Sequence, residues 1–277
     1  QACSAALRGK DFEVLELDAG HDVVQRLSEL QPDVVFNALH GRWGEDGSIQ
    51  GVLEWLRIPY THSGVMASAL AMDKNRSKHI FSDFGLPTAQ GFIIDKTNLI
   101  NAHPLQRPYV VKPINEGSSI GVYFVNPAED PPLNLSSDMP SVLMVEEYIP
   151  GRELTVTVMG KKALLVTDII TQKWYDYDAK YKNGGSVHEV PAKIPEKIED
   201  KCLEYALSAH ELIGCRGISR ADFRWDESLG LDGLILLEIN TQPGMTPTSL
   251  APEQAEICGI KFGDLCQWLV EDASCDR

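Results

Sequence analysis

The strongest constraint on the fold is a change in secondary-structure pattern part-way along the chain. Over the first 62 residues, short apolar runs alternate with helical segments. The pattern predicts strands at Phe12–Leu17 and Asp33–Leu39 and helices at Val23–Leu30 and Ile49–Leu56. This order is typical of an α/β unit with a parallel sheet. After Pro87, strands follow one another with intervening turns, as in antiparallel sheets.

We therefore expect an α/β protein with α+β elements in three domains. They are an N-terminal parallel-sheet domain at 1–62, a central domain at 63–149 and a C-terminal domain at 150–277. The central domain is predicted to hold helices at 65–72 and 74–84 and strands at 91–94, 109–113, 120–125 and 142–147. The C-terminal domain is predicted to hold a hairpin at 154–170, a long loop at 171–191, a helix at 196–213, strands at 217–225 and 233–240, and two final helices.

Composition narrows the function classes. The chain has 277 residues, 43% of them apolar, and a formal net charge of -15, which argues against general binding to nucleic acid. No apolar run approaches the roughly 18 residues of a membrane span, and we expect no membrane association. The six cysteines lack zinc-site spacing, so scattered thiols and a cytoplasmic setting are expected.

Polar residues alternate on the last two predicted strands. Arg220 and Asp222 share a face of one strand, and Glu238 and Asn240 share a face of the other. If the strands are antiparallel neighbours, three oxygen ligands meet on one face, which suits Mg²⁺ shared with substrate phosphates. A polar sheet face with an ordinary ion pair is the alternative.

A second motif follows Lys112, where small residues from Gly117 to Gly121 separate two predicted strands. Backbone N–H groups and a nearby lysine can hold a phosphate in such a loop, and an ordinary hairpin turn is the alternative. Gly117–Gly121 also matches the G-x-S-x-G elbow of serine hydrolases, with Ser119 as nucleophile. That elbow requires strand–turn–helix, whereas this context predicts strand–turn–strand.

Two loops complete the candidate site. The loop at 171–191 carries three tyrosines and a tryptophan and is a candidate lid that excludes water. His40 begins a glycine-rich loop at the carboxyl end of a predicted parallel strand, where ligands bind in open α/β sheets.

In this order, the motifs resemble the D-alanine–D-alanine ligase family of ATP-grasp enzymes, which serve bacterial peptidoglycan synthesis. The matching segments cover nearly the whole chain: HGRWGEDG at 40–47, YTHSGVMASALAMDK at 60–74, VKPINEGSSIG at 111–121, EEYIPGRE at 146–153, YDYDAKY at 175–181, RAD at 220–222 and LEINTQPGMT at 237–246.

The resemblance implies a three-domain ATP-grasp fold with ATP between the central and C-terminal sheets. The implied phosphate contacts are Lys74, Lys112, Ser118 and Ser119, and Lys112 is also close to the adenine. The implied adenine and ribose contacts are Glu146, Glu147, Ile149 and Glu153, and Lys180 is a further implied ATP contact. The implied ligands of two Mg²⁺ ions, which Mn²⁺ could replace, are Asp222, Glu238 and Asn240. The implied catalytic and substrate-binding residues are Arg220, Gly244, Tyr181, Ser118, Ser249 and His40.

The implied reaction joins two D-alanines through an acyl phosphate, in a bacterial cytoplasmic enzyme that is a homodimer in this family. The alternatives are an ester-forming D-alanine–D-lactate ligase, a non-catalytic nucleotide-binding protein and, more distantly, a serine hydrolase. The family also has a first strand and a glycine-rich loop before the helix that opens this chain. We therefore expect the polypeptide to continue upstream of Gln1 with those elements, which would complete the first D-alanine site.

Overall fold

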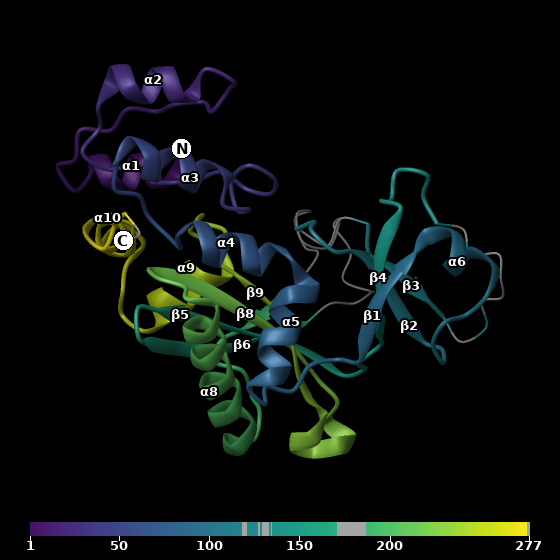
Figure 1. Ribbon diagram of the computed structural model, residues 1–277. Helices are drawn as coiled ribbons and strands as arrows, with labels where there is room; N and C mark the ends of the chain where they lie inside the picture. Colours follow the sequence, from purple (N-terminus) through teal and green to yellow (C-terminus); the bar gives the residue numbers. More distant parts are fainter. Residues whose placement is uncertain (118–120, 127, 129–132, 134, 171–186, 276–277) are drawn as a thin grey trace.

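Two antiparallel sheets dominate the molecule, with most of the helices gathered around one of them (Figure 1). The computed structural model describes residues 1–117, 121–126, 128, 133, 135–170 and 187–275. The predicted α/β class and the antiparallel texture after Pro87 are both confirmed. Among the described residues, no helix is both long enough and apolar enough to cross a bilayer.

The smaller sheet has four strands and a core of its own. Its strand order is β1-β4-β2-β3, and helix α6 (Lys96–Asn101) follows β1. The strands are β1 (Gly91–Asp95), β2 (Tyr109–Pro113), β3 (Tyr123–Val125) and β4 (Val142–Glu147). Tyr109, Val111, Leu143 and Val145 pack with Leu99 of α6 in this core. Because these side chains are buried within the unit itself, the four-stranded sheet is a separately packed body.

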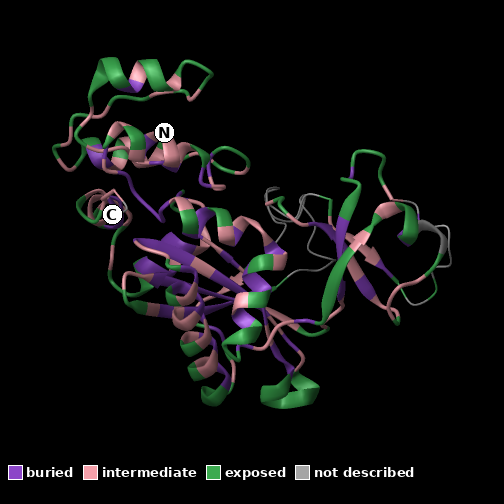
Figure 2. Cartoon of the chain, in the orientation of Figure 1, coloured by how far each residue is buried: buried purple, intermediate pink, exposed green. Residues whose placement is uncertain are grey.

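The larger sheet has five strands in the order β7-β6-β5-β8-β9 and carries the main core. The strands are β5 (Arg152–Met159), β6 (Lys162–Ile170), β7 (Val187–Glu189), β8 (Ile218–Trp225) and β9 (Leu234–Asn240), with a 3₁₀ segment η1 (Glu227–Gly233) between the last two. Helix α8 (Glu196–Ile213) covers one face, and its buried residues recur every three or four positions, as the amphipathic pattern predicts. Figure 2 shows the burial concentrated in this sheet.

Four other helices flank the larger sheet. They are α4 (Val65–Met72) and α5 (Lys74–Asp83), which precede the smaller sheet in sequence, and α9 (Leu250–Ile257) and α10 (Phe262–Glu271), which end the chain. The opening helix α1 (Ala2–Arg8) packs through Leu7 against Leu265 and Leu269 of α10. Both ends of the described chain are therefore anchored beside the C-terminal unit.

The predicted N-terminal parallel sheet is wrong in its detail. Helices α2 (Val23–Leu30) and α3 (Ser48–Leu56) form as expected, but 12–17 and 33–39 do not form strands. A single parallel bridge joins Val35 to Tyr60. Two residues after this bridge, the Asn37 N–H donates to the Thr61 side-chain hydroxyl, 3.0 Å away. It is therefore not available for the backbone hydrogen bond that would extend the bridge into a strand pair.

The chain crosses between the two sheets twice, and both crossings are fixed to the larger sheet. At the first, Leu236 N donates to Pro87 O at 2.8 Å, and Thr88 forms a parallel bridge to Leu236. At the second, the Arg224 side chain donates to Ile149 O at 3.1 Å and to Gly151 O at 2.9 Å. These contacts set where the smaller sheet sits against the larger one.

Candidate active site

Four polar side chains meet on one face of β8 and β9, as the alternation predicts. The strands are antiparallel neighbours in which Asp222 lies opposite Glu238 and Arg220 lies opposite Asn240. A register shift immediately after Asp222 ends this polar stretch. The opposite face of β8 carries Ala221 and Phe223 into the core, so the alternation separates the site from the interior.

Charges on this face are closely balanced. Arg220 donates to both oxygens of Asp222, at 2.8 and 2.7 Å, and the Thr155 hydroxyl donates to Asp222 Oδ1 at 2.6 Å. Lys74 Nζ lies 3.3 Å from Glu238 Oε2. These ion pairs, Arg220 with Asp222 and Lys74 with Glu238, are also what the alternative of an ordinary polar sheet face predicts.

The same face also fits a hard divalent cation. Two carboxylates and the Asn240 amide supply oxygen donors and no sulfur, which is the donor set that Mg²⁺ prefers. Within the described part of the chain, no cluster of three or more His, Cys, Asp or Glu residues could hold a metal ion. A cation here therefore depends on the Asn240 oxygen and on oxygens from a bound substrate.

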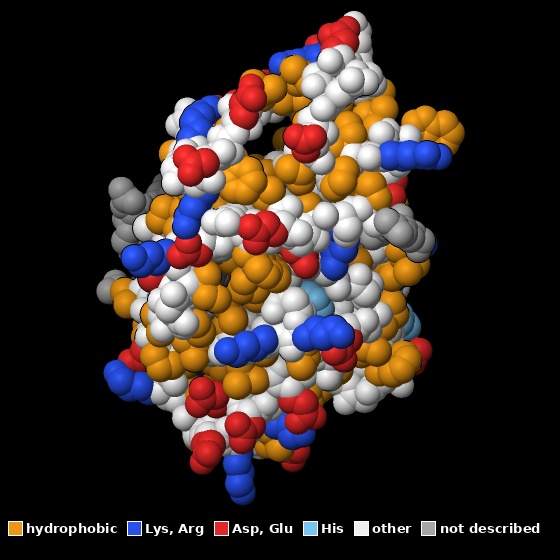
Figure 3. All heavy atoms as spheres, turned by 90° about the vertical axis from the view of Figure 1, so that its left-hand side faces the viewer, with side chains coloured by type: hydrophobic (Ala, Val, Ile, Leu, Met, Phe, Trp, Pro, Cys, Tyr) orange, Lys and Arg blue, Asp and Glu red, His pale blue; other side chains and the backbone are white. Residues whose placement is uncertain are grey.

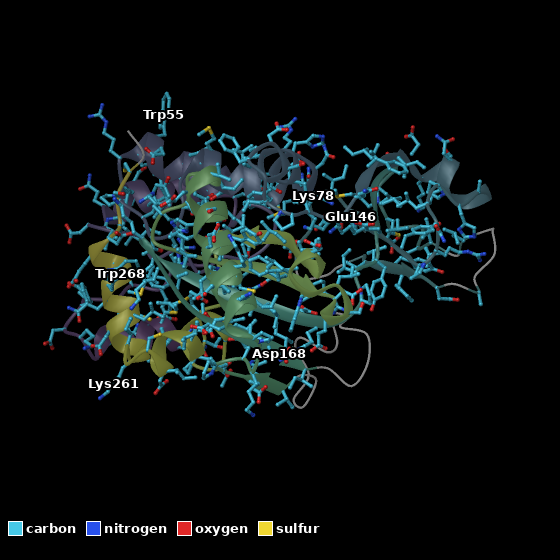
Figure 4. The ribbon with its side chains drawn as sticks, turned by 90° about the horizontal axis from the view of Figure 1, so that it is seen from below. Trp55, Lys78, Glu146, Asp168, Lys261 and Trp268 are labelled. Carbon is cyan, nitrogen blue, oxygen red and sulfur yellow. The ribbon has the colours of Figure 1, made fainter. Side chains whose placement is uncertain are left out.

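A buried charge cluster joins helix α5 to the smaller sheet. Glu146 on β4 is 4% exposed, and its carboxylate pairs with both Lys78 and Lys112. Lys78 also donates to Ala89 O at 2.5 Å. In Figure 4, Lys78 and Glu146 lie next to each other where α5 meets the smaller sheet.

The two lysines control the ionisation of Glu146. Burial acts to raise the pKa of Glu146, but the charges of Lys112 and Lys78 outweigh it and hold the pKa below its usual value. Burial lowers the pKa of Lys78, and repulsion from Lys112 adds to this against the attraction of Glu146. Two cations share one carboxylate here, so the cluster has room for further negative charge.

The predicted phosphate loop reaches the start of α5. Lys74 Nζ donates to Glu116 O at 2.6 Å, and Lys74 N donates to Ile114 O at 3.2 Å. Lys74 thereby contacts both the loop and Glu238 of the larger sheet. The loop serines Ser118 and Ser119 lie outside the described residues, as do Lys180 and Tyr181.

The second crossing between the sheets carries the predicted adenine and ribose contacts. Glu147 exchanges two hydrogen bonds with Gln90, from its backbone N–H to Gln90 O and from Gln90 N to its Oε1, each 2.9 Å. Ile149 O accepts from Arg224, and Glu153 Oε2 lies 3.8 Å from Arg224 Nη1. Arg224 thus organises this segment from the neighbouring strand.

A cavity of about 1590 Å³ reaches the N-terminal segments from the β8–β9 face. The predicted residues that line it are His40, Lys74, Glu153, Arg220, Asp222, Glu238, Asn240, Gly244 and Ser249. Figure 3 shows a hollow among the N-terminal segments on the face that it views. The described residues that line this cavity do not include the predicted adenine contacts Lys112, Glu146, Glu147 and Ile149. These contacts therefore lie apart from the cavity.

Two turns line the end of the cavity where the D-alanine contacts are predicted, and this end is called the amino-acid end below. His40 Nδ1 lies 2.9 Å from Glu45 Oε1, which ties the two ends of this loop together. Across from it, a Cβ on Gly244 would lie 3.0 Å from Ser249 Oγ, so glycine lets the turn fold tightly. Ser249 Oγ in turn lies 2.8 Å from Thr246 Oγ1.

Three residues of this region escaped the sequence analysis: Lys78, Arg224 and Thr155. Lys78 lies one helical turn after Lys74, and Arg224 continues the alternation of Arg220 and Asp222 along β8. Both spacings were available as signals. Thr155 contacts Asp222 from β5, a pairing that depends on strand order and that a single strand's pattern does not contain.

The facing sheets, the lysines between them and the paired carboxylates on β8 and β9 define a ligase of the ATP-grasp class. Family models described as D-ala D-ala ligase N-terminus and D-ala D-ala ligase C-terminus match residues 12–63 and 80–271. The chain belongs to the D-alanine–D-alanine ligase family.

Its relatives match over almost the whole chain. It is 64% identical to the D-alanine–D-alanine ligase of Ruegeria sp. (strain TM1040) and 65% identical to that of Ruegeria pomeroyi, covering 99% of this chain and 90% of each relative. Among solved structures, it is similar to the D-alanine–D-alanine ligase from Bacillus anthracis complexed with ATP, with 26% identity and a TM-score of 0.79. That match covers 98% of this chain and 89% of the other.

Proposed function

We propose that the protein joins two D-alanines to D-alanyl-D-alanine with ATP, for peptidoglycan precursor synthesis. The observation that carries the proposal is the in-register pairing of Asp222 with Glu238 on a sheet face that also presents Arg220 to the cavity, with Lys74 of α5 next to Glu238. The relatives named above bear the name of this activity. The similar ligase from Bacillus anthracis was solved in complex with ATP.

We assign the ATP contacts as follows. Lys74 and Lys112, with Ser118 and Ser119, bind phosphates, and Lys180 is a further ATP contact. Glu146 and the backbone of Glu147 and Ile149 bind adenine, and Glu153 binds ribose. Supporting this, the excess positive charge of the Lys78, Lys112 and Glu146 cluster favours an anionic ligand.

Asp222, Glu238 and Asn240 would hold two Mg²⁺ ions, or Mn²⁺ in their place. When bound, such ions disperse the negative charge of the transferring phosphoryl group. Arg220 and Lys74 are already next to these carboxylates and can turn to the substrate oxygens once the carboxylate charge is shared.

The reaction then has two steps. The carboxylate of one D-alanine attacks the γ-phosphorus of ATP, which forms an acyl phosphate and releases ADP. The amine of the second D-alanine attacks the acyl carbon, loses a proton and expels phosphate. Arg220 and the Gly244 N–H stabilise the oxyanion, while His40, Ser249, Tyr181 and Ser118 hold the reacting groups.

A phosphate-release assay with single amino acids tests this function. Release that requires D-alanine, with dipeptide as product, supports the ligase, whereas nucleotide binding without turnover indicates a binding module. D-alanine should outcompete D-lactate as second substrate at about pH 7 to 8, since a free amine is the better nucleophile. An equal or larger yield of the ester product there contradicts amide specificity.

We further propose a three-domain homodimer that acts in the bacterial cytoplasm on small molecules, without nucleic acid or membrane. Trp55 on α3 is 88% exposed and points away from the body of the molecule (Figure 4). Met66 on the adjacent helix α4 is also exposed, so an apolar surface is available to a second copy. Sedimentation at several concentrations tests this, and a monomer at all of them refutes it.

A further inference from the structure

Two buried amide side chains bridge the N-terminal segment to the turn that follows β9. Asn37 is 3% exposed and Gln242 is 2% exposed. Asn37 Nδ2 donates to Gln242 Oε1 at 2.7 Å, across 205 residues of sequence. Neither residue has a role in the function proposed above.

The bridge extends to the backbone on both sides. Asn37 Nδ2 also donates to Gly44 O at 3.0 Å, and Asn37 Oδ1 accepts from Leu39 N at 3.1 Å. Gln242 Nε2 donates to Leu39 O. Almost every polar group of the two amides is thus matched, which is the condition under which buried amides are tolerated. Truncating either residue would leave the other with an unmatched buried group.

The bridge holds together the two turns at the amino-acid end of the cavity. On one side, Leu39 and Gly44 bracket the loop that contains His40. A Cβ on Gly44 would lie 2.5 Å from Leu39 Cβ, so this loop folds tightly on itself. On the other side, Gln242 N donates to Asn240 Oδ1 at 2.9 Å, and Gly244 follows two residues later.

We propose that Asn37 and Gln242 are positioning residues that hold the His40 loop against the Asn240–Gly244 turn and so set the geometry of the amino-acid site. The proposal rests on the proposed ligase function for its substrate. It assigns the pair no contact with ATP, because their bonds lead to the His40 loop and the β9 turn rather than to the lysine cluster.

A double-mutant cycle with Asn37→Leu and Gln242→Leu tests the pair. Each single variant should lower kcat/KM for D-alanine roughly tenfold or more, because a small misplacement of reacting groups is costly, while KM for ATP stays within about twofold. The double variant should lose no more than either single variant, since both remove one bridge. Gln242→Glu keeps the acceptor for Asn37 but loses the donor to Leu39 O, so it should lose activity as Gln242→Leu does.

Ser219→Ala is the matched control. It removes another buried contact, Ser219 Oγ to His210 Nδ1 at 2.7 Å, on the face of β8 that packs against α8. It should leave KM for D-alanine unchanged. Hydrogen exchange gives a second readout: both single variants should raise exchange in 39–45 and in 241–245 together.

Three results would each overturn the proposal. The first is a double variant whose loss is the product of the two single losses, and the second is an equal increase in KM for ATP and for D-alanine. The third is increased exchange in only one of the two segments. Wild-type protein that releases no phosphate with D-alanine would instead refute the ligase function. The exchange measurement would then still decide whether the bridge couples the two turns.

Discussion

Two buried histidines should make the protein lose stability in mild acid. His62 is 2% exposed and His210 is 4% exposed. Burial, followed by the positive charges of His40 and Arg216, lowers the pKa of His62 to about 3, against the hydrogen bond with Thr61. Burial lowers the pKa of His210 to about 4. His62 Nε2 has no hydrogen-bond partner among the described residues, so a proton there gains no compensating contact.

The size of the effect follows from proton linkage. Both rings are neutral in the folded protein, whereas in the unfolded chain they take up a proton below their ordinary pKa of 6.5. Below pH 6.5 the unfolded state therefore binds more protons, and stability falls with pH until the folded pKa is reached. Between about pH 7 and pH 5, each histidine should remove about 2 kcal/mol, and the two together about 4 kcal/mol. A domain of ordinary stability has about 5 to 15 kcal/mol in all.

Urea unfolding of the wild type, His62→Gln and His210→Gln at these two pH values measures the effect. Each variant should show a drop in the free energy of unfolding that is about 2 kcal/mol smaller than that of the wild type. His79→Gln, at an exposed histidine, should show the full wild-type drop. If His62→Gln also keeps the full drop, the buried ring is not what the acid titrates, and the reasoning fails.

Three further substitutions probe the site. Glu146→Gln leaves the charges of Lys78 and Lys112 without their carboxylate and should cost about 3 to 5 kcal/mol in urea unfolding; a loss below about 1 kcal/mol would contradict the charge balance described for this cluster. Glu238→Gln removes one charge while keeping the shape of the side chain, so the Mg²⁺ concentration for half-maximal turnover should rise roughly tenfold or more. The far-UV circular dichroism spectrum should not change. Full activity at limiting Mg²⁺ would show the metal assignment to be wrong. Arg224→Gln loses its charge-assisted bonds to the second crossing and should raise KM for ATP with little change in KM for D-alanine; equal changes in both would place its effect elsewhere.

The elements that the sequence predicts best are those whose pattern is local. Helix α8 begins and ends where predicted, because its apolar spacing is regular and Gly214 stops it in a left-handed conformation. The polar face of β8 and β9 was also predictable, since two strands close in sequence need only pair with each other. The loop at 171–191 contains a short strand, β7, and helix α6 was likewise not predicted.

The features that the sequence predicted wrongly or missed depend on contacts with residues far away in the sequence. The segments at 12–17 and 33–39 have strand-like composition, but a strand exists only when a neighbour accepts its hydrogen bonds. At Asn37 the neighbour is instead the Thr61 side chain. The Asn37–Gln242 bridge joins residues 205 positions apart, a separation at which periodicity carries no information.

The two crossings between the sheets have a mechanical consequence. A body attached to another at two fixed points keeps one easy motion, rotation about the line through those points. Here the points are the bridge of Thr88 to Leu236 and the grip of Arg224 on Ile149 and Gly151. Because each sheet has its own core, a rotation about this axis would leave the packing inside each sheet unchanged, but it would have to break the buried pairing of Glu146 on β4 with Lys78 on α5. The contacts of Lys74 with Ile114 and Glu116 also join α5 to the loop after β2, so the same rotation would change the place of Lys74 against that loop.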